Sequence, residues 1–442
     1  MRERIITMII NKGQIIKELN KIALPLLLSS LTCVLMGLVD QAFVGHLTIY
    51  AYAGVGLVSS CINSLILTLA AMSLAFNIEG AKLKGQNATY QLEEETGNYI
   101  FLALCIGGVL CLILIIFCKS ILKMGFSLEG QTLKEAVDYL LVYSFMIPLN
   151  LVNFIYSGLF KIYRQAKYIF YAAVLGNIIN LCLDYLLIFG NCGFPKMGSL
   201  GAALGSVVAV FICTCYLAFV LRKLVHIRPK YYLQKGKLQN ICKTILPFWG
   251  QQVLEDILFV TALNAIIARL GTLTLATYTM LFQISKLVQL PMRSYSTANT
   301  TMVSEEVGST RLMIIKTTQR CTLMLMVVWF SCLFSGLVFM KEHIISCITN
   351  DQELIKTACY YLPIALGIQI FNYIFVVFKS TLQALGKAPL VLKIAFLVNA
   401  GMLILILLMG RNLLTIYILL GVSFFINSLL LYVKVKRVLI NR

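Results

Sequence analysis

The feature that most constrains the fold of this chain is a repeated run of about 20 apolar residues between short polar joints. A helical run of this length matches the roughly 30 Å hydrocarbon core of a bilayer. Twelve spans are predicted, near 22–45, 51–76, 97–118, 139–161, 168–189, 199–221, 244–268, 273–299, 318–340, 357–381, 389–409 and 413–433. Because they lack the alternating pattern of a membrane barrel, we expect an all-α integral membrane protein with twelve transmembrane helices.

The positive charge of the chain follows the predicted topology. The formal net charge of +19 would suit a nucleic-acid partner. However, about 25 of the 37 Lys and Arg residues fall in joints on the side of the N-terminus, and about 8 fall on the other side. This positive-inside bias places both termini in the cytoplasm and excludes a nucleic-acid partner. The 14 cysteines show no metal-ligand spacing, so we expect no resident cofactor.

The two halves of the chain are copies of one repeat. Pro25 and Pro247 are separated by the same number of positions as Asn177 and Asn399. One offset across separate blocks indicates duplication. The expected organisation is an amphipathic N-terminal segment over 1–21, a six-helix bundle over 22–221, a cytoplasmic linker over 222–243 and a second six-helix bundle over 244–442.

Six spans per half give parallel repeats, related by a pseudo-two-fold axis along the membrane normal. Two such bundles that rock on one another would alternate access to a site between them. This architecture is typical of transporters that work as a single chain, so we expect a monomer.

Two aspartates lie inside predicted spans at the same depth. Asp40 is about 18 residues from the start of the first span and Asp184 about 17 from the start of the fifth, so both lie roughly 25 Å above the inner boundary. Charges inside spans are costly and mark ion pathways. Two carboxylates in a desolvated site cannot both be ionised without a large cost, and a proton or Na⁺ relieves it. We therefore predict a coupling-ion site.

Polar side chains at fitting positions accompany these acids. In the fifth span, Asn177 and Asn180 share a helix face with Asp184. The fourth span adds Asn150, Asn153 and Ser157 at the same spacing, and Ser206 of the sixth span lies at a similar depth. Their oxygens could complete the shell of a hard cation. The alternative is that they are interhelical hydrogen-bonding groups. In the second copy of the repeat, the positions that correspond to Asp40, Asn180 and Asp184 hold Ala262, Met402 and Ile406, which argues against a purely architectural role.

The second half carries a different set of charges. Glu255 and Asp256 lie in the seventh span, and Lys286 and Arg293 share one face of the eighth. One interpretation pairs Glu255 with Lys286 in a buried salt bridge, and another has the basic groups favour an anionic or zwitterionic substrate. Two further lysines, Lys379 and Lys393, would extend to the inner surface. A polar wall could be added by Gln251, Gln252, Tyr278, Gln283, Gln289, Asn372 and Tyr373.

Several segments resemble the multidrug and toxic compound extrusion (MATE) family. They are IALPLLLSSLTCVLMGLVDQAFVGHL at 22–47, AVDYLLVYSFMIPLNLVNFIYSGLF at 136–160, LGNIINLCLDYLLIFG at 175–190 and GSLGAALGSVVA at 198–209. The resemblance continues through LPFWGQQVLEDILFV and LQALGKAP in the second half. It implies a twelve-helix antiporter in the bacterial inner (cytoplasmic) membrane that exports small organic compounds in exchange for H⁺ or Na⁺.

The resemblance also implies roles for residues. The ion site of the DinF-like branch corresponds to Asp40, Asn153, Asn180 and Asp184, with Ser206 where that branch usually has threonine. If the ion is Na⁺, Asp40, Asn180 and Asp184 would be ligands. Pro25 corresponds to a proline at which the first helix bends. In the NorM-like branch a glutamate corresponds to Glu255, but the partner aspartate falls at Tyr373, which is not acidic.

Other functions remain open at this point. A flippase for lipid-linked oligosaccharides, of the same superfamily, would suit the basic residues of the second half. Such flippases, however, often have extra spans and no pair that resembles Asp40 and Asp184. A membrane-embedded prenyl or glycosyl transferase would need aspartate-rich diphosphate motifs, which are absent. A major-facilitator carrier would carry Gly-Asp-Arg-Arg after the second span, where this chain has EGAKLKGQNATYQLEEETG.

The bending role of Pro25 leads to a first prediction. Proline removes one helical hydrogen bond and allows a bend. Substitution Pro25→Ala should therefore slow transport turnover several-fold and weaken substrate binding only modestly. The measurement is efflux from proteoliposomes together with equilibrium binding, and unchanged turnover would exclude the bend as a coupling step.

Overall fold

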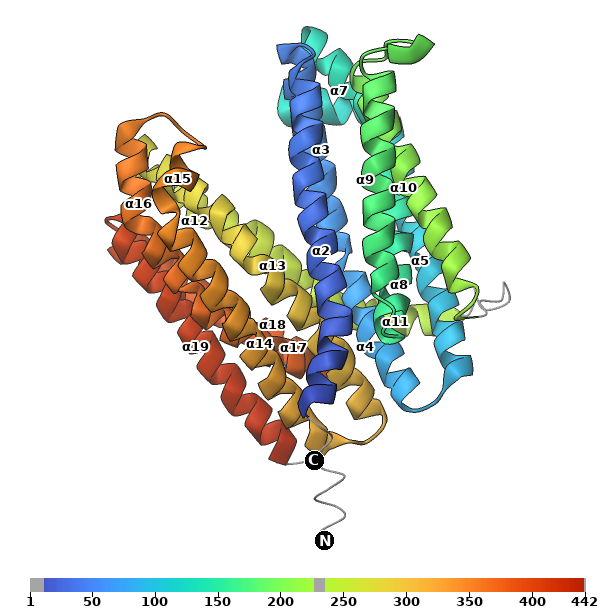
Figure 1. The fold of residues 1–442 in the computed structure, drawn as a ribbon, viewed down its shortest axis with the longest axis vertical. Coiled ribbons are helices and arrows are strands. Elements are labelled where there is room, and N and C mark those ends of the chain that lie inside the picture. Colours follow the sequence, from blue (N-terminus) through green and yellow to red (C-terminus); the bar gives the residue numbers. More distant parts are fainter. Residues whose placement is uncertain (1–11, 226–234, 441–442) are drawn as a thin grey trace. The chain divides into compact units, whose positions relative to one another are not determined.

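The structure is a computed structural model that describes residues 12–225 and 235–440, apart from the side chains of Leu38, Asp256 and 235–238. Residues 1–11 of the predicted N-terminal segment and 226–234 of the predicted linker therefore lie outside the described residues. Every regular element within the described ranges is helical (Figure 1).

The first half runs through helices that match the predicted spans. These are α2 (Lys12–Gly45), α3 (Ile49–Leu69), α4 (Ala71–Gly85), α5 (Thr89–Ile116), α6 (Cys118–Ser120), a π-turn (Ile121–Gly125), α7 (Gly130–Tyr143), α8 (Met146–Ile162), α9 (Lys167–Leu187), a 3₁₀ turn (Asn191–Gly193) and α10 (Ser199–Leu221). Residues 12–21 are the start of α2 and continue directly into the first span.

The second half repeats this order. Its elements are α11 (Lys235–Gln252), a π-helix (Val253–Phe259), α12 (Val260–Ala268), α13 (Thr272–Gly308), α14 (Leu312–Phe339), α15 (Lys341–Ser346), α16 (Gln352–Gly367), α17 (Gln369–Ala384), α18 (Ala388–Met409) and α19 (Leu413–Ile440). The linker ends at the described start of α11, eight residues before the predicted boundary at 243.

Twelve membrane-spanning segments result, which confirms the predicted fold class. Eleven segments of the described chain are long and apolar enough to cross a bilayer. The twelfth is α13, which falls short in composition because Lys286, Arg293 and many hydroxyl residues interrupt its apolar sequence.

Some spans are broken helices, and the breaks have local causes. The fourth span divides into α7 and α8 at Ser144 and Phe145. Pro148 has no N–H to donate to the carbonyl of Ser144. Ile147 N instead donates to Ser144 O over 3.1 Å, which is the tighter spacing of a 3₁₀ turn.

The described chain forms two compact units. The N-unit comprises Leu24–Gly80 and Ala88–Ile245, and the C-unit comprises Ala81–Asn87, Leu246–Arg442 and the start of α2 up to Ala23. The chain thus changes unit directly before Leu24 and before Leu246, the residues that precede the two repeated prolines. The compact units therefore differ from the sequence halves in three places: the start of α2, Ala81–Asn87 and the start of α11.

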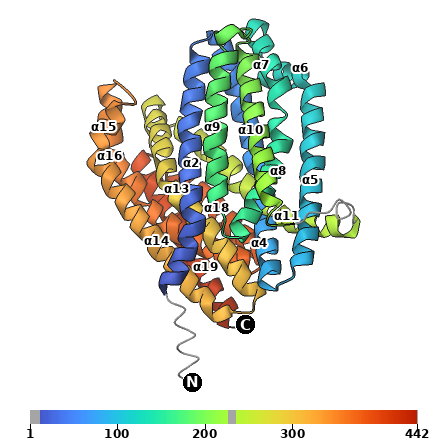
Figure 2. The same ribbon diagram turned by 45° about the vertical axis from the view of Figure 1, so that its right-hand side comes forward.

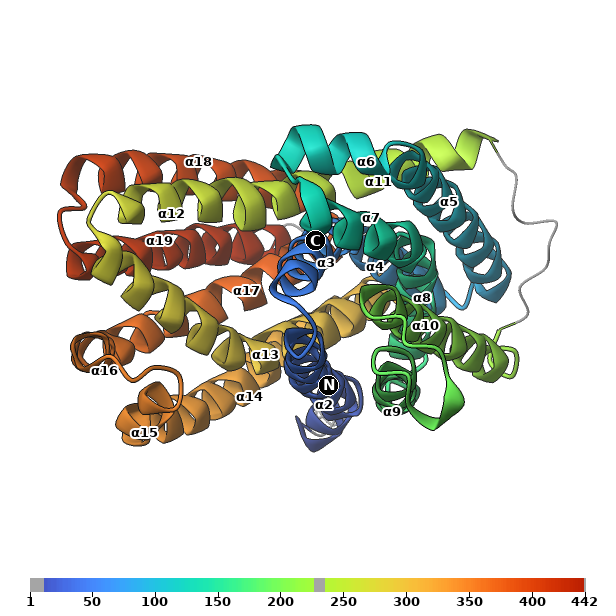
Figure 3. The ribbon, with the colours of Figure 1, turned by 90° about the horizontal axis from the view of Figure 1, so that it is seen from above.

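Within the N-unit, α9 packs along α10, and α5 packs along α8 (Figure 2). Within the C-unit, α18 and α19 are neighbours and α12 lies beside α18 (Figure 3). Small residues permit the closest approaches. A Cβ added to Gly107 of α5 would lie 2.6 Å from Pro148 Cα on α8, so only glycine fits there.

Gly107 and Gly108 provide a matched test of this packing. Gly107→Ala should destabilise the protein by about 1–3 kcal/mol, because the new methyl group meets backbone atoms that cannot move aside. Gly108→Ala should be neutral or slightly stabilising, since nothing lies within 4 Å of the added methyl group on that side of α5. The measurement is the thermal unfolding midpoint in detergent, and equal midpoints would contradict the packing.

Candidate functional site

A buried cluster of two carboxylates and one amide lies between α2 and α9 of the N-unit. Asn180 Nδ2 donates to Asp40 Oδ1 over 2.9 Å and to Asp184 Oδ2 over 3.0 Å. Asp184 is 2% exposed and Asn180 is 6% exposed, while Asp40 is half-buried. The structure thus brings together the three residues predicted as Na⁺ ligands.

The position of the cluster follows from the sequence of α9. Asn177, Asn180 and Asp184 project from one face of this helix, one turn apart. Asn177 Nδ2 donates to the backbone oxygen of Thr32 over 3.1 Å, which fixes α9 against α2. Asn177 therefore acts as an interhelical hydrogen-bonding residue, and the next turn carries Asn180 to the carboxylate of Asp40.

Helix α10 closes the other side of Asp184 through glycine. A Cβ added to Gly205 would lie 2.5 Å from Asp184 Oδ1, and one added to Gly201 would lie 2.7 Å from the backbone of Leu187. The Gly201–Gly205 spacing is the small-residue pattern that lets membrane helices approach closely. Ser206, the predicted hydroxyl, is half-buried at the next position of α10, so Gly205 is the α10 residue against the carboxylate.

The hydrogen bonding of the cluster is incomplete among the described residues. Asp184 Oδ1 is buried without a hydrogen-bond partner there. Two carboxylates that share one amide have excess acceptors, so a proton or a small cation would satisfy both the charge and the free oxygen. The residues present therefore fit a coupling ion.

The two asparagines of α8 form no hydrogen bond with this cluster among the described residues. Asn153 Oδ1 is buried and has no hydrogen-bond partner in the described chain. Asn150 Nδ2 donates to the oxygen of Met146 in its own helix over 2.8 Å. Asn153 thus remains available as an acceptor, whereas the amide hydrogens of Asn150 serve its own helix.

Sequence reasoning missed two tyrosines of α7. The rings of Tyr139 and Tyr143 stack with centroids 4.7 Å apart, and Tyr143 Oη donates to Asn63 Oδ1 over 3.4 Å. Both side chains are buried in the N-unit. An aromatic pair spaced i, i+4 on the buried face of a span was the available signal.

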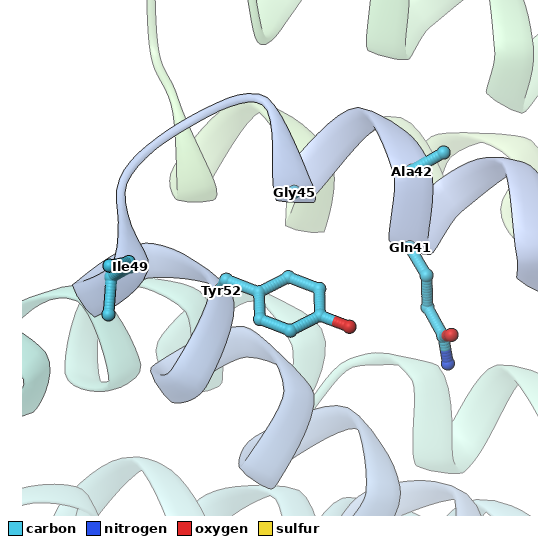
Figure 4. A pocket seen from close by; sticks show the side chains of 5 residues that line it. All are labelled: Gln41, Ala42, Gly45, Ile49 and Tyr52. Atoms are coloured by element: carbon cyan, nitrogen blue, oxygen red, sulfur yellow. The ribbon is translucent and has the colours of Figure 1, made fainter. Parts of the chain in front are cut away.

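A pocket of about 370 Å³ lies beside the C-terminal end of α2. Figure 4 shows its lining from α2 and α3, with the Tyr52 ring and the Gln41 side chain reaching into the same space. Its residues are Gln41, Ala42, Gly45, Ile49 and Tyr52. Gln41 follows Asp40 in the sequence of α2, but Asp40, Asn180 and Asp184 are not among the lining residues.

The C-unit pairs Glu255 differently from the prediction. Lys379 Nζ lies 2.6 Å from Glu255 Oε2, so the interpretation that paired Glu255 with Lys286 is wrong. The cause is helix packing: α17 faces the π-helix across the C-unit and brings a lysine there, which spacing along α13 could not indicate.

The other predicted residues of the second half lie as follows. Lys286 and Arg293 are exposed on α13, and Lys286 Nζ lies 5.0 Å from the centre of the Phe282 ring. Tyr373 is fully buried and its hydroxyl donates to the oxygen of Val288. The side chain of Asp256 lies outside the described residues.

These features define a class of protein: a polytopic membrane transporter built from two copies of a six-helix repeat. The MatE family model matches the chain twice, over residues 25–186 and 247–409. The two matches begin at the repeated prolines, Pro25 and Pro247, and therefore follow the offset of the repeat. The chain belongs to the MATE family, whose members are transporters and not enzymes.

Curated relatives agree with this assignment. The chain is 28% identical over 267 residues to the probable multidrug resistance protein NorM of Thermotoga maritima, a match that covers 60% of this chain and 54% of the relative. It is 27% identical over 357 residues to NorM of Streptococcus pneumoniae, covering 79% and 78%. It is 23% identical over 402 residues to YoeA of Bacillus subtilis, covering 87% and 84%.

Solved structures share the fold. A transporter of the MOP superfamily from Pyrococcus furiosus, described as having a binding pocket of reverse polarity, matches with a TM-score of 0.85 at 16% identity and 96% coverage of both chains. An outward-facing MATE family transporter matches equally well. At this identity the likeness establishes the fold alone.

Gly205 offers a test of the cluster geometry. Gly205→Ala should reduce ion-coupled efflux by about tenfold or more, because the methyl group would displace the Asp184 carboxylate from Asn180. Gly56→Ala on α3 is the matched control, since nothing lies within 4 Å of that position. Efflux is measured in proteoliposomes at equal protein content, and equal rates for both variants would contradict the close approach.

Proposed function

We propose that this protein is a secondary antiporter that exports small organic compounds in exchange for H⁺ or Na⁺ by alternating access. The observation that carries the proposal is the Asp40–Asn180–Asp184 cluster, in which one buried carboxylate oxygen has no partner among the described residues. Buried ionisable residues in membrane spans are typical of ion pathways.

The chemistry of the cluster suits reversible binding of one cation. In the unloaded state the Asn180 amide donates one hydrogen to each carboxylate and partly offsets their repulsion. A proton bound at Asp184 Oδ1, or Na⁺ held between the carboxylates, removes the remaining repulsion. Binding and release of the ion therefore change the net charge of the Asp40–Asn180–Asp184 cluster. The side-chain oxygens of Asn153 and Ser206 would serve as further ligands of the ion.

The charge state of Asp40 could couple ion binding to the conformation of the transporter. Asp40 and Pro25 lie on the same helix, α2, which begins in the C-unit and enters the N-unit at Leu24. A bend at Pro25 would move the part of α2 that carries Asp40. In this proposal ion binding favours one bend of α2, and substrate release follows from it.

Multidrug efflux is the best-supported substrate range, because the names of the curated relatives describe multidrug resistance proteins. The pocket formed with Gln41 and Tyr52 would accept a planar or cationic group against the Tyr52 ring. These relatives do not favour the flippase alternative. We further propose that the protein works as a monomer in the bacterial inner membrane. The positive-inside bias supports a topology with both termini in the cytoplasm.

The central test removes each carboxylate charge. Asp40→Asn and Asp184→Asn should each abolish ion-driven efflux, because neither amide can exchange a proton or balance Na⁺. A fluorescent organic cation is loaded into proteoliposomes, and its exit is driven first by a pH gradient and then by a Na⁺ gradient. The gradient that drives the wild-type protein identifies the ion.

Asn177→Ala is the control for this test, because it loses only the hydrogen bond to the backbone of Thr32. It should lower stability by about 1 kcal/mol while coupling persists. Full coupling in both folded aspartate variants would refute the proposed ion site.

A further inference from the structure

A second charged cluster lies wholly within the C-unit. It consists of two side-chain hydrogen bonds, one helical turn apart, between antiparallel helices. Gln251 and Glu255 are one turn apart on α11 and the π-helix, and Lys379 and Gln383 are one turn apart on α17. Lys379 Nζ donates to Glu255 Oε2 over 2.6 Å. Gln383 Nε2 donates to Gln251 Oε1 over 2.9 Å, so each helix turn has its partner.

The carboxylate of Glu255 is fully used in this arrangement. Its second oxygen, Oε1, accepts from Gln251 Nε2 over 2.8 Å. Glu255 and Lys379 are 24% and 19% exposed, so neither charge is freely hydrated. The ammonium group also lies 5.6 Å from the centre of the Phe375 ring. Asp184 of the N-unit, in contrast, keeps one buried oxygen without a partner among the described residues.

The internal repeat indicates that the two charges belong together. In the first copy of the repeat, the positions that correspond to Glu255 and Lys379 hold Cys33 and Ser157, which are both uncharged. One repeat therefore has both members of the pair and the other has neither. An uncompensated charge between membrane helices is strongly destabilising, so a pair that is present or absent as a whole is the expected pattern.

We propose that Lys379 is a built-in counter-cation that occupies the cation position on Glu255. The lysine ammonium supplies the positive charge that a bound ion would otherwise bring, and its attachment to α17 keeps it there throughout the transport cycle. The C-unit carboxylate then takes up no coupling ion, and the ion cycle is confined to the N-unit. This last consequence rests on the proposed antiport.

The geometry favours this role over an accidental surface pair. Exposed pairs depend on two mobile side chains and contribute little. Here Gln251 holds the carboxylate, and Gln251 itself is 3% exposed and is held by Gln383 from the same helix as Lys379. The carboxylate is thus oriented toward α17 before the charge of Lys379 is considered. A position oriented in this way should accept another small cation once the lysine is removed.

The stability test is a cycle of Lys379→Ala, Glu255→Gln and the double variant, in the full-length protein. Lys379→Ala should lower the thermal unfolding midpoint by several degrees, because Glu255 loses its counter-cation. Adding Glu255→Gln should recover most of this loss. Ammonium chloride should raise the midpoint of Lys379→Ala more than choline chloride does at equal ionic strength, and this difference should vanish in the double variant.

Lys393→Ala is the matched control, because Lys393 is an exposed lysine of the neighbouring helix α18. It should change the midpoint little and respond equally to the two salts. The proposal is overturned if Lys379→Ala is as stable as the wild-type protein, if Glu255→Gln does not restore it, or if ammonium has no advantage over choline.

The transport test uses Glu255→Gln with Lys379→Met, which removes both charges and keeps the side-chain volumes similar. Ion-coupled efflux should remain within about threefold of the wild-type rate, whereas Asp40→Asn loses it. Loss of coupling in this folded double variant would assign Glu255 a part in the ion cycle and overturn the confinement to the N-unit. If the wild-type protein moves no substrate under either gradient, the antiport proposal fails, and the unfolding measurements still decide the role of Lys379.

Discussion

The cost of an unsatisfied polar group in the bilayer is the constraint on which the rest of this structure depends. It requires the spanning segments to be helical, because a helix satisfies its own backbone. The break between α7 and α8 obeys the same constraint. Pro148 cannot donate to Ser144, and the next N–H toward the break, that of Ile147, takes over the acceptor. The hydrogen bond lost at the proline is thus replaced within one turn, and the fourth span continues beyond the break.

The same constraint explains how charge is placed in the two units. In the N-unit two carboxylates share the amide of Asn180, and one oxygen of Asp184 stays open. In the C-unit Glu255 has Lys379 and Gln251 as partners and both of its oxygens are used. Of these two clusters in the described chain, the first is therefore incomplete and the second is complete. The incomplete cluster is suited to an exchangeable ion, and the complete one is suited to permanent neutrality.

Close helix packing shapes the N-unit and makes its carboxylate cluster possible. Gly205 leaves room for the Asp184 carboxylate beside α10, and Gly107 lets α5 approach Pro148 of α8. Between membrane helices, where lipid is as apolar as leucine, packing and interhelical hydrogen bonds replace the hydrophobic effect as the cause of association. Asn177 illustrates this substitution, since its hydrogen bond to Thr32 joins the two helices that carry the cluster. Glycine and asparagine thus take the role that large apolar residues have in soluble proteins.

The sequence by itself determined the number of spans, the duplication and the common depth of Asp40 and Asp184, because apolar length, constant offset and helical rise are properties of the chain alone. It also placed Asn177, Asn180 and Asp184 on one helix face. Only the tertiary structure decided that Glu255 pairs with Lys379, that Gly205 lies against Asp184, and that Tyr143 bonds to Asn63. The physical reason is that a membrane helix has apolar residues on most of its faces. Its periodicity therefore does not fix its rotation or its neighbours, which are set by contacts between residues distant in sequence.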